Sequence, residues 1–81
     1  MNIKLDYYKV FCMVAQCQSF SAAAKKLYMT QPAVSQTIMQ LESELGISLF
    51  RRSARGVVLT AEGGLLYEYI HTAMNLIQVG E

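Results

Sequence analysis

A run of uncharged and mostly hydrogen-bonding side chains lies between residues 31 and 40 of this 81-residue chain. Glutamine can pair bidentately with adenine, serine and threonine can bond either member of a base pair, and a threonine methyl can touch thymine. An ordinary exposed helix more often carries pairs of Glu and Lys. The run therefore predicts contact with base edges, and a polar face that meets only water is the alternative. Its members are Gln31, Ser35, Gln36, Thr37, Met39 and Gln40.

Three arginines that follow this run are suited to binding phosphate. Arg51 and Arg52 precede a predicted turn and Arg55 lies within it, and arginines on such a hairpin can follow a DNA backbone or enter a narrow minor groove. The charge distribution agrees, because residues 20–55 carry five Lys and Arg against two Glu, whereas residues 56–81 carry three Glu and no Lys or Arg. Arginines that only keep the hairpin soluble are the alternative.

Catalytic and metal-binding chemistry is not predicted. The sequence holds no cysteine–histidine pair, paired carboxylates, glycine-rich phosphate loop or metal-ligand cluster at a useful spacing, so we expect no enzyme. His71 is the only histidine and has no partner for a metal site. Cys12 and Cys17 lie five residues apart on one predicted helix, which is poor geometry for a disulfide. We expect free thiols in a reducing cytoplasm, inert rather than redox-sensing.

Two helices are predicted ahead of the polar run. Apolar side chains at spacings of three and four predict an amphipathic first helix over about residues 4–16. A short helix follows over 22–27 with Ser21 as its cap, because this segment is rich in alanine, the residue of highest helix propensity. The inward stripe of the first helix consists of Leu5, Tyr8, Phe11, Cys12 and Ala15.

The polar run itself lies on a third predicted helix, over about residues 31–45. A turn at 28–29 precedes it, Thr30 caps it, and Pro32 occupies its first turn. Gly46 ends it in the usual C-terminal position. Two short helices joined by a tight turn form a helix-turn-helix, whose second helix enters the major groove of DNA. The inward stripe of this helix consists of Val34, Ile38, Leu41 and Leu45.

Two short β-leaning segments follow, over about residues 49–52 and 57–59, and a turn at 53–56 joins them into a hairpin. Thr60 then caps a fourth helix that continues to near the C-terminus. The predicted fold is mainly α. It is a winged helix-turn-helix with three helices, a two-stranded β-hairpin wing over 51–58, and a long C-terminal linker helix.

Several motifs occur together at fixed spacings along the chain. They are Phe20-Ser21-Ala22-Ala23-Ala24, Thr30-Gln31-Pro32-Ala33-Val34-Ser35 and Leu45-Gly46-Ile47-Ser48-Leu49-Phe50, with Ile38, Leu41-Glu42, Arg52, Leu59-Thr60 and Gly63. In this combination the chain resembles the DNA-binding domain of bacterial LysR-type transcriptional regulators over nearly its whole length. The resemblance implies sequence-specific binding of double-stranded DNA and control of transcription, with the helix at about 31–45 as the recognition helix.

The resemblance also implies roles for single residues. Gln36 departs from the family pattern because many members carry arginine there, which predicts weaker binding or a different preferred sequence. Glu62 replaces a small residue and is compatible with a helix start. The predicted base contacts are Gln31, Pro32, Ser35 and Gln36. The resemblance and the charge pattern together predict phosphate or wing contacts at Ser21, Lys26, Thr30, Thr37, Arg51, Arg52 and Arg55.

The last predicted helix has too many apolar residues for one stripe. We expect one row to cover the core and a second row to pair with another copy of the chain, because an exposed apolar row favours self-association with twofold symmetry. Burial of both rows within the domain is the alternative. Leu76 belongs to the second row with Leu65 and Tyr69. The predicted dimerisation residues are Leu65, Leu66, Tyr69, Ile70, Ala73, Met74 and Ile77.

These predictions divide the chain into a DNA-binding domain at 1–60 and a linker and dimerisation helix at 61–81. The expected partners are an inverted-repeat operator in double-stranded DNA and a second copy of the chain, with RNA polymerase left open. No membrane contact is expected, and the protein is expected on the nucleoid in the cytoplasm. No cofactor is predicted in this chain, although the resemblance implies a small-molecule effector for a further C-terminal domain. A different winged-helix regulator and a helical protein-interaction module are the rival interpretations.

Overall fold

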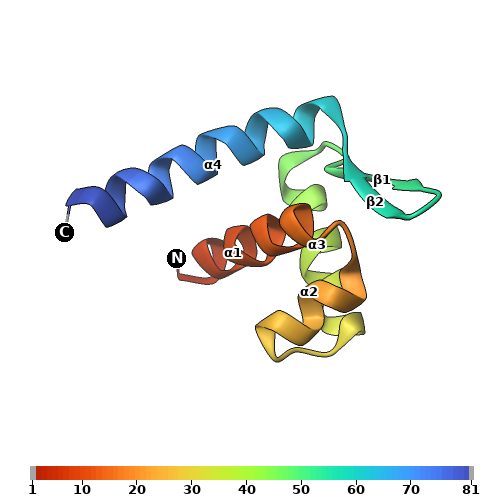
Figure 1. The fold of residues 1–81 in the computed structure, drawn as a ribbon. Helices are drawn as coiled ribbons and strands as arrows, with labels where there is room; N and C mark the ends of the chain where they lie inside the picture. The colour runs from red at the N-terminus through yellow and green to blue at the C-terminus, as the bar shows by residue number, and fades with distance from the viewer. Residues whose placement is uncertain (1, 81) are drawn as a thin grey trace.

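The computed structural model describes residues 2–80, and it describes their side chains except at 2–5, 74 and 76–80. Within this range the elements are α1 (Asn2–Cys17), α2 (Phe20–Leu27), α3 (Gln31–Leu45), β1 (Phe50–Ser53), β2 (Gly56–Leu59) and α4 (Ala61–Gly80). Their order and type confirm the predicted winged helix-turn-helix. In Figure 1, α2 lies below α1, α3 crosses α1 so that its green C-terminal end lies above it, the hairpin projects to one side, and α4 extends along α1 as a long arm.

One hydrophobic core lies where α1, α2, α3 and the hairpin meet. Its largest fully buried side chains come from three different segments, so the core joins the helices to the hairpin rather than serving one element alone. Burying a large apolar side chain contributes about 1.5–3 kcal/mol. The core residues are Val10, Phe11, Cys12, Val14, Ala23, Ala24, Val34, Ile38, Leu41, Leu49 and Val57.

The buried side of α1 is wider than the predicted stripe. Tyr8 and Ala15 are only half-buried, whereas Val10 and Val14, which the stripe omitted, belong to the core. The reason is that α1 packs against α2 and α3 as well as against α4 and β2. The side chain of Leu5, also predicted to face inward, lies outside the described residues.

The bounds of α3 are those predicted from the sequence. Val34, Ile38 and Leu41 are buried, which confirms most of the inward stripe. The prediction for Leu45 is wrong, because this side chain is 38% exposed. It is the last residue of α3, and the core side chains of this helix end one turn earlier.

Both predicted ends of α3 are confirmed. Thr30 Oγ1 accepts a hydrogen bond from the Ala33 N–H at 3.2 Å. Gly46 has the left-handed φ of 71°, and its N–H donates to the Glu42 carbonyl at 2.8 Å. The predicted turn between α2 and α3 contains Tyr28, which ends α2 in a left-handed conformation with φ of 56°.

The cap of α2 is Ser19, and the prediction of Ser21 is wrong. Ser19 Oγ accepts a hydrogen bond from the Ala22 N–H at 3.1 Å. The helix therefore begins two residues earlier than predicted, and Phe20 belongs to its first turn. There the Phe20 ring packs against the Phe50 ring, with 6.0 Å between their centroids.

The hairpin differs from the prediction because β1 begins and ends one residue later, β2 begins one residue earlier, and the turn is two residues shorter. Its strands pair antiparallel, and Ser53 lies opposite Gly56, so Ala54 and Arg55 alone form the turn. Neither Ala54 nor Arg55 has a positive φ, so the turn is not one of the primed types that two-residue hairpin loops favour, and the positive φ lies on the following Gly56. The pairing also places Arg52 opposite Val57.

The hairpin is fastened to the turn between α1 and α2. Val57 N–H donates to the Gln18 carbonyl at 3.2 Å. Gly56 has a φ of 146°, and a Cβ at this position would collide with the same carbonyl oxygen. Glycine is therefore required here for its backbone conformation and for the close approach of Gln18.

Hydrogen bonds also fix the segments on either side of the hairpin. The Glu42 carboxylate of α3 accepts from the Leu49 N–H at 2.7 Å. Thr60 Oγ1 donates to the Ser48 carbonyl at 2.6 Å and accepts from the Gly63 N–H at 3.0 Å, which confirms Thr60 as a cap of α4. The hairpin and the start of α4 are thus held to the end of α3.

Candidate nucleic-acid interface

The outward side of α3 carries no charge from residue 31 to residue 41. Gln31 and Pro32 are exposed in its first turn, and Gln36 follows one turn later. Ser35 is half-buried and Met39, at 66%, is well exposed. The side chains that the sequence predicts for base contacts therefore share the outer surface of one helix, near its N-terminal end.

Thr37 lies on a different side of α3. It lines two depressions with Tyr7 of α1, one of which Gln36 and Gln40 also line, and its hydroxyl donates to the Ala33 carbonyl at 2.9 Å. The side chain is half-buried. Its hydrogen-bond donor is therefore already used inside the helix, and it faces α1 rather than the hairpin.

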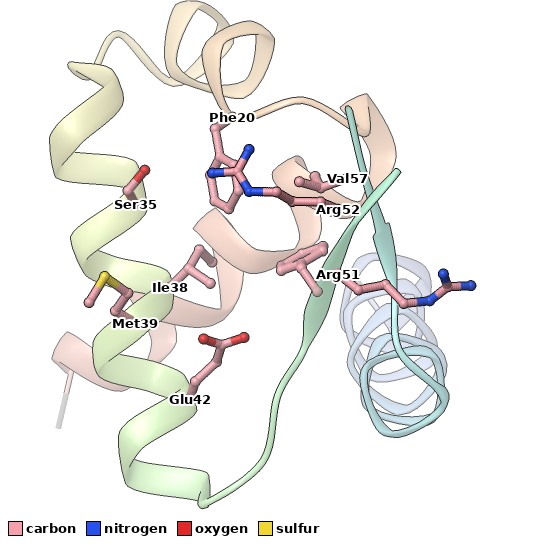
Figure 2. A pocket seen from close by; sticks show the side chains of 9 residues that line it. Phe20, Ser35, Ile38, Met39, Glu42, Arg51, Arg52 and Val57 are labelled. Atoms are coloured by element: carbon pink, nitrogen blue, oxygen red, sulfur yellow. The ribbon is translucent and has the colours of Figure 1, made fainter. Parts of the chain in front are cut away.

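A groove separates α3 from the hairpin, as Figure 2 shows. Its α3 wall includes Ser35 and Met39, and Glu42 lies at the end nearer the C-terminus of α3. The apolar residues in the groove come from α2, α3 and the hairpin, and the aromatic rings among them pack on one another. The groove is lined by Phe20, Ser35, Ile38, Met39, Glu42, Phe50, Arg51, Arg52 and Val57.

The three predicted arginines point in different directions. In β1, Arg52 lies opposite the buried Val57, whereas Arg51 lies opposite Val58. Successive side chains of a strand point to opposite faces, and Figure 2 shows Arg52 reaching over the groove toward Phe20 while Arg51 points away from α3. Arg55 lies in the turn at the hairpin tip. The sequence alone does not show which of these arginines faces the groove, because the strand register determines the face from which Arg51 and Arg52 project.

The remaining predicted phosphate contacts lie around α2 and the start of α3. Ser21 is exposed in the first turn of α2, and its Oγ lies 3.2 Å from Ser19 Oγ. Lys26 is exposed in the last turn of the same helix. Thr30 is exposed at the N-cap of α3. Cations and hydroxyls thus lie on elements next to the uncharged outer surface of α3.

Two residues with a part in this surface were not predicted. The sequence predicts that Met39 faces outward, but its thioether lacks the strong hydrogen-bonding groups from which the base contacts were predicted. Glu42 holds the segment that leads into the wing through its bond to the Leu49 N–H. No local signal reveals such a bond across seven residues.

The two apolar rows predicted on α4 have different surroundings. Leu66 and Ile70 pack against the core, whereas Leu65 and Tyr69 are 60% and 70% exposed. Ala73 is also exposed. Burial of both rows within the domain is therefore wrong. The side chains predicted at Met74, Leu76 and Ile77 lie outside the described residues.

The other chemistry-bearing residues are part of the packing. Cys12 and Cys17 are free, and burial raises the pKa of the Cys12 thiol. The His71 ring lies against Tyr67, with 5.4 Å between centroids, and its Nδ1 is 3.3 Å from the Asn75 amide nitrogen. Among the described residues, no group of three His, Cys, Asp or Glu is arranged to hold a metal ion. No described helix has both the length and the apolar character needed to cross a bilayer.

Comparison with known proteins gives one consistent family. The family described as "Bacterial regulatory helix-turn-helix protein, lysR family" matches residues 5–64. The chain is 42% identical over 79 residues to the HTH-type transcriptional regulator AlsR of Bacillus subtilis, a match that covers 98% of this chain and 26% of AlsR. The chain spans about a fifth to a half of the length of the curated relatives it matches, and about a quarter of AlsR.

Two solved DNA complexes contain a similar domain. The BenM_DBD complex with catB site 1 DNA matches with a TM-score of 0.82 and 42% identity, covering 93% of this chain and 82% of that one. The CbnR_DBD–DNA complex matches with a TM-score of 0.82 and 34% identity, covering 99% of this chain and 90% of that one.

Proposed function

The chain belongs to the lysR family of bacterial regulatory helix-turn-helix proteins, and on this premise we propose that it binds double-stranded DNA sequence-specifically and so controls transcription of bacterial genes. One observation carries the proposal. The outer surface of α3 is uncharged and rich in hydrogen-bonding groups, while exposed cations lie on the neighbouring α2 and hairpin. Such a surface separates base contacts, which specify sequence, from phosphate contacts, which supply affinity.

Base recognition falls to the N-terminal half of α3 in the major groove. Gln31 and Gln36 are suited to adenine, Ser35 can bond either member of a base pair, and Pro32 offers an apolar contact. All four lie on or beside the outer surface of the helix. Similarity to the BenM_DBD and CbnR_DBD complexes with DNA supports this assignment.

Phosphate contacts fall to both neighbours of α3. On the hairpin, Arg52 faces the groove and Arg55 occupies the tip, so these two are favoured over Arg51. Ser21, Lys26 and Thr30 are exposed on or beside α2 and suit the backbone on the other side. Thr37 is left out of the proposed contacts, because its hydroxyl donates to the Ala33 carbonyl.

A homodimer through α4 completes the proposal. Leu65 and Tyr69 form an exposed apolar row, with Ala73 beyond them, whereas Leu66 and Ile70 are used by the core. Pairing of two such rows about a twofold axis would present two recognition helices to an inverted repeat, with half-sites about one helical turn apart or a multiple of it. Since bacterial DNA lies in the cytoplasm, the proposed site of action is the nucleoid.

The test is selection from a randomised duplex pool in the presence of nonspecific competitor, followed by sequencing. We expect an inverted repeat to be enriched. Enrichment of a single half-site would retain DNA binding and contradict dimer formation by this chain. No enrichment by a folded sample would refute the proposed function and favour the protein-interaction module, whose binding would depend much less on salt.

A further inference from the structure

Met39 is the one large apolar side chain exposed in the middle of the otherwise polar outer surface of α3. It is 66% exposed, whereas its neighbour Ile38 is 2% exposed and belongs to the core. Single exposed apolar residues are common on protein surfaces. Met39 differs from those because it lies on the surface that DNA would cover.

The position of Met39 also favours a contact with DNA. It lies four residues after Ser35, one turn along the same side of α3, and both line the groove that Arg52 overhangs from the hairpin (Figure 2). If Arg52 binds the DNA backbone, the neighbouring bases would lie close to the side of α3 that carries Ser35 and Met39. Met39 is then the apolar group that extends from the wall, and its unbranched thioether can adjust to the shape it meets.

The chemistry of the surrounding surface narrows what Met39 can recognise. Guanine is read most often by Arg or Lys, and α3 has neither between residues 31 and 45. Glu42, the first charged residue of the helix, is engaged with the Leu49 N–H. Among the groups that a base pair exposes in the major groove, the 5-methyl of thymine is the one that an apolar side chain can bind.

We propose that Met39 is a specificity-determining residue that contacts the 5-methyl group of a thymine in each half-site. The inference rests on the proposed function and adds to it the chemical identity of one recognised base. Contact removes apolar surface of both the thioether and the methyl from water. Replacing that thymine with deoxyuridine deletes only the methyl and leaves every Watson–Crick hydrogen bond in place.

The experiment uses the duplex that the selection enriches. Each thymine is replaced singly by deoxyuridine, and the Kd is measured for the unchanged chain and for Met39→Ala. Beside any position that Pro32 contacts, we expect one position per half-site at which the replacement weakens binding by about fourfold through Met39, the effect of one buried methyl group. In Met39→Ala, the same replacement should have no effect, because the partner of the methyl is gone.

Two further variants control the experiment. Met39→Leu keeps an apolar side chain and should keep the sensitivity to deoxyuridine. Leu45→Ala removes another partly exposed apolar side chain of α3, at the far end of the helix, and should also keep it. Circular dichroism and thermal melting confirm that each variant is folded.

The outcomes separate this inference from the proposed function. Failure to enrich any sequence would refute sequence-specific binding itself. Enrichment with no position sensitive to deoxyuridine would refute the thymine contact and leave DNA binding intact. Persistence of every sensitive position in Met39→Ala, or loss of the Met39-dependent one in Leu45→Ala, would assign the methyl contact to another residue and overturn the inference.

Discussion

Arg52 and Arg51 are adjacent residues that differ in the face of the hairpin from which they project, and this provides a sharp test of the proposed wing. Arg52 shares the face of the buried Val57 and reaches over the groove beside α3, while Arg51 points the other way (Figure 2). Both side chains are exposed. Replacing either one by alanine therefore removes the same charge at almost the same place, with little effect expected on folding.

The expected change in the salt dependence of DNA binding follows from counterion release. Each phosphate contact contributes about 0.9 to the slope of log Kobs against log salt concentration. We expect Arg52→Ala to lower the slope by about this amount for each half-site bound, so that on a duplex with one half-site the loss of affinity between 50 and 200 mM salt becomes about 3.5-fold smaller. Arg51→Ala should change the slope much less. A small effect through space is expected, since the Debye length is about 10 Å at 0.1 M salt.

Fluorescence anisotropy on a labelled duplex over a series of salt concentrations measures both slopes. Arg52→Lys serves as a second control, because it keeps the charge but loses the planar fork that binds phosphate bidentately. It should restore most of the slope and less of the affinity. Equal slopes for Arg51→Ala and Arg52→Ala, or a larger loss for Arg51→Ala, would refute the orientation of the wing on DNA.

Three other substitutions test separate parts of the molecule. Gln31→Ala should reduce discrimination between the selected and a scrambled duplex without changing the salt slope, measured by the same assay, and unchanged discrimination would remove Gln31 from the base contacts. Gly56→Ala should lower the free energy of unfolding by about 1–3 kcal/mol or more, because φ is 146° and the added Cβ meets a carbonyl. Open space surrounds Gly64, so Gly64→Ala should be neutral or should stabilise the domain by about 1 kcal/mol. Equal losses of unfolding free energy for the two glycine variants in urea denaturation would contradict the role given to Gly56. Tyr69→Glu should give folded monomers in sedimentation experiments, whereas Leu66→Glu should unfold the domain, and a dimer that survives Tyr69→Glu would place the interface elsewhere.

The limits of α3 were predictable because its end signals are local. Thr30 bonds an amide three residues ahead, and Gly46 supplies a left-handed conformation directly after the helix. The cap of α2 was mispredicted because two serines compete for it. Ser19 is the observed cap, and Phe20 directly after it packs against Phe50, a contact between residues thirty positions apart. A short-range pattern contains no information about that contact.

The direction of each predicted site side chain was not predictable to the same degree. A shift of one residue in strand pairing would exchange the faces of Arg51 and Arg52. The observed register is maintained by the two-residue turn between Ser53 and Gly56. The sequence indicates that the wing is basic, and only the pairing distinguishes the arginine beside the groove from the one directed away.

The Gln18 carbonyl connects the strand register of the hairpin to the helix-turn-helix formed by α2 and α3. It accepts the Val57 N–H directly opposite Arg52, and it belongs to the turn that leads into α2. At the other strand, the Glu42 carboxylate ties α3 to the residue before β1. The arginine that would bind the backbone is thus held relative to both helices of the helix-turn-helix. Because α3 itself carries no cation over residues 31–45, in the proposed complex its distance from the bases would depend on phosphate contacts made by its neighbours. Loosening the hairpin should therefore weaken sequence discrimination as well as affinity, even though no base-contacting side chain has changed.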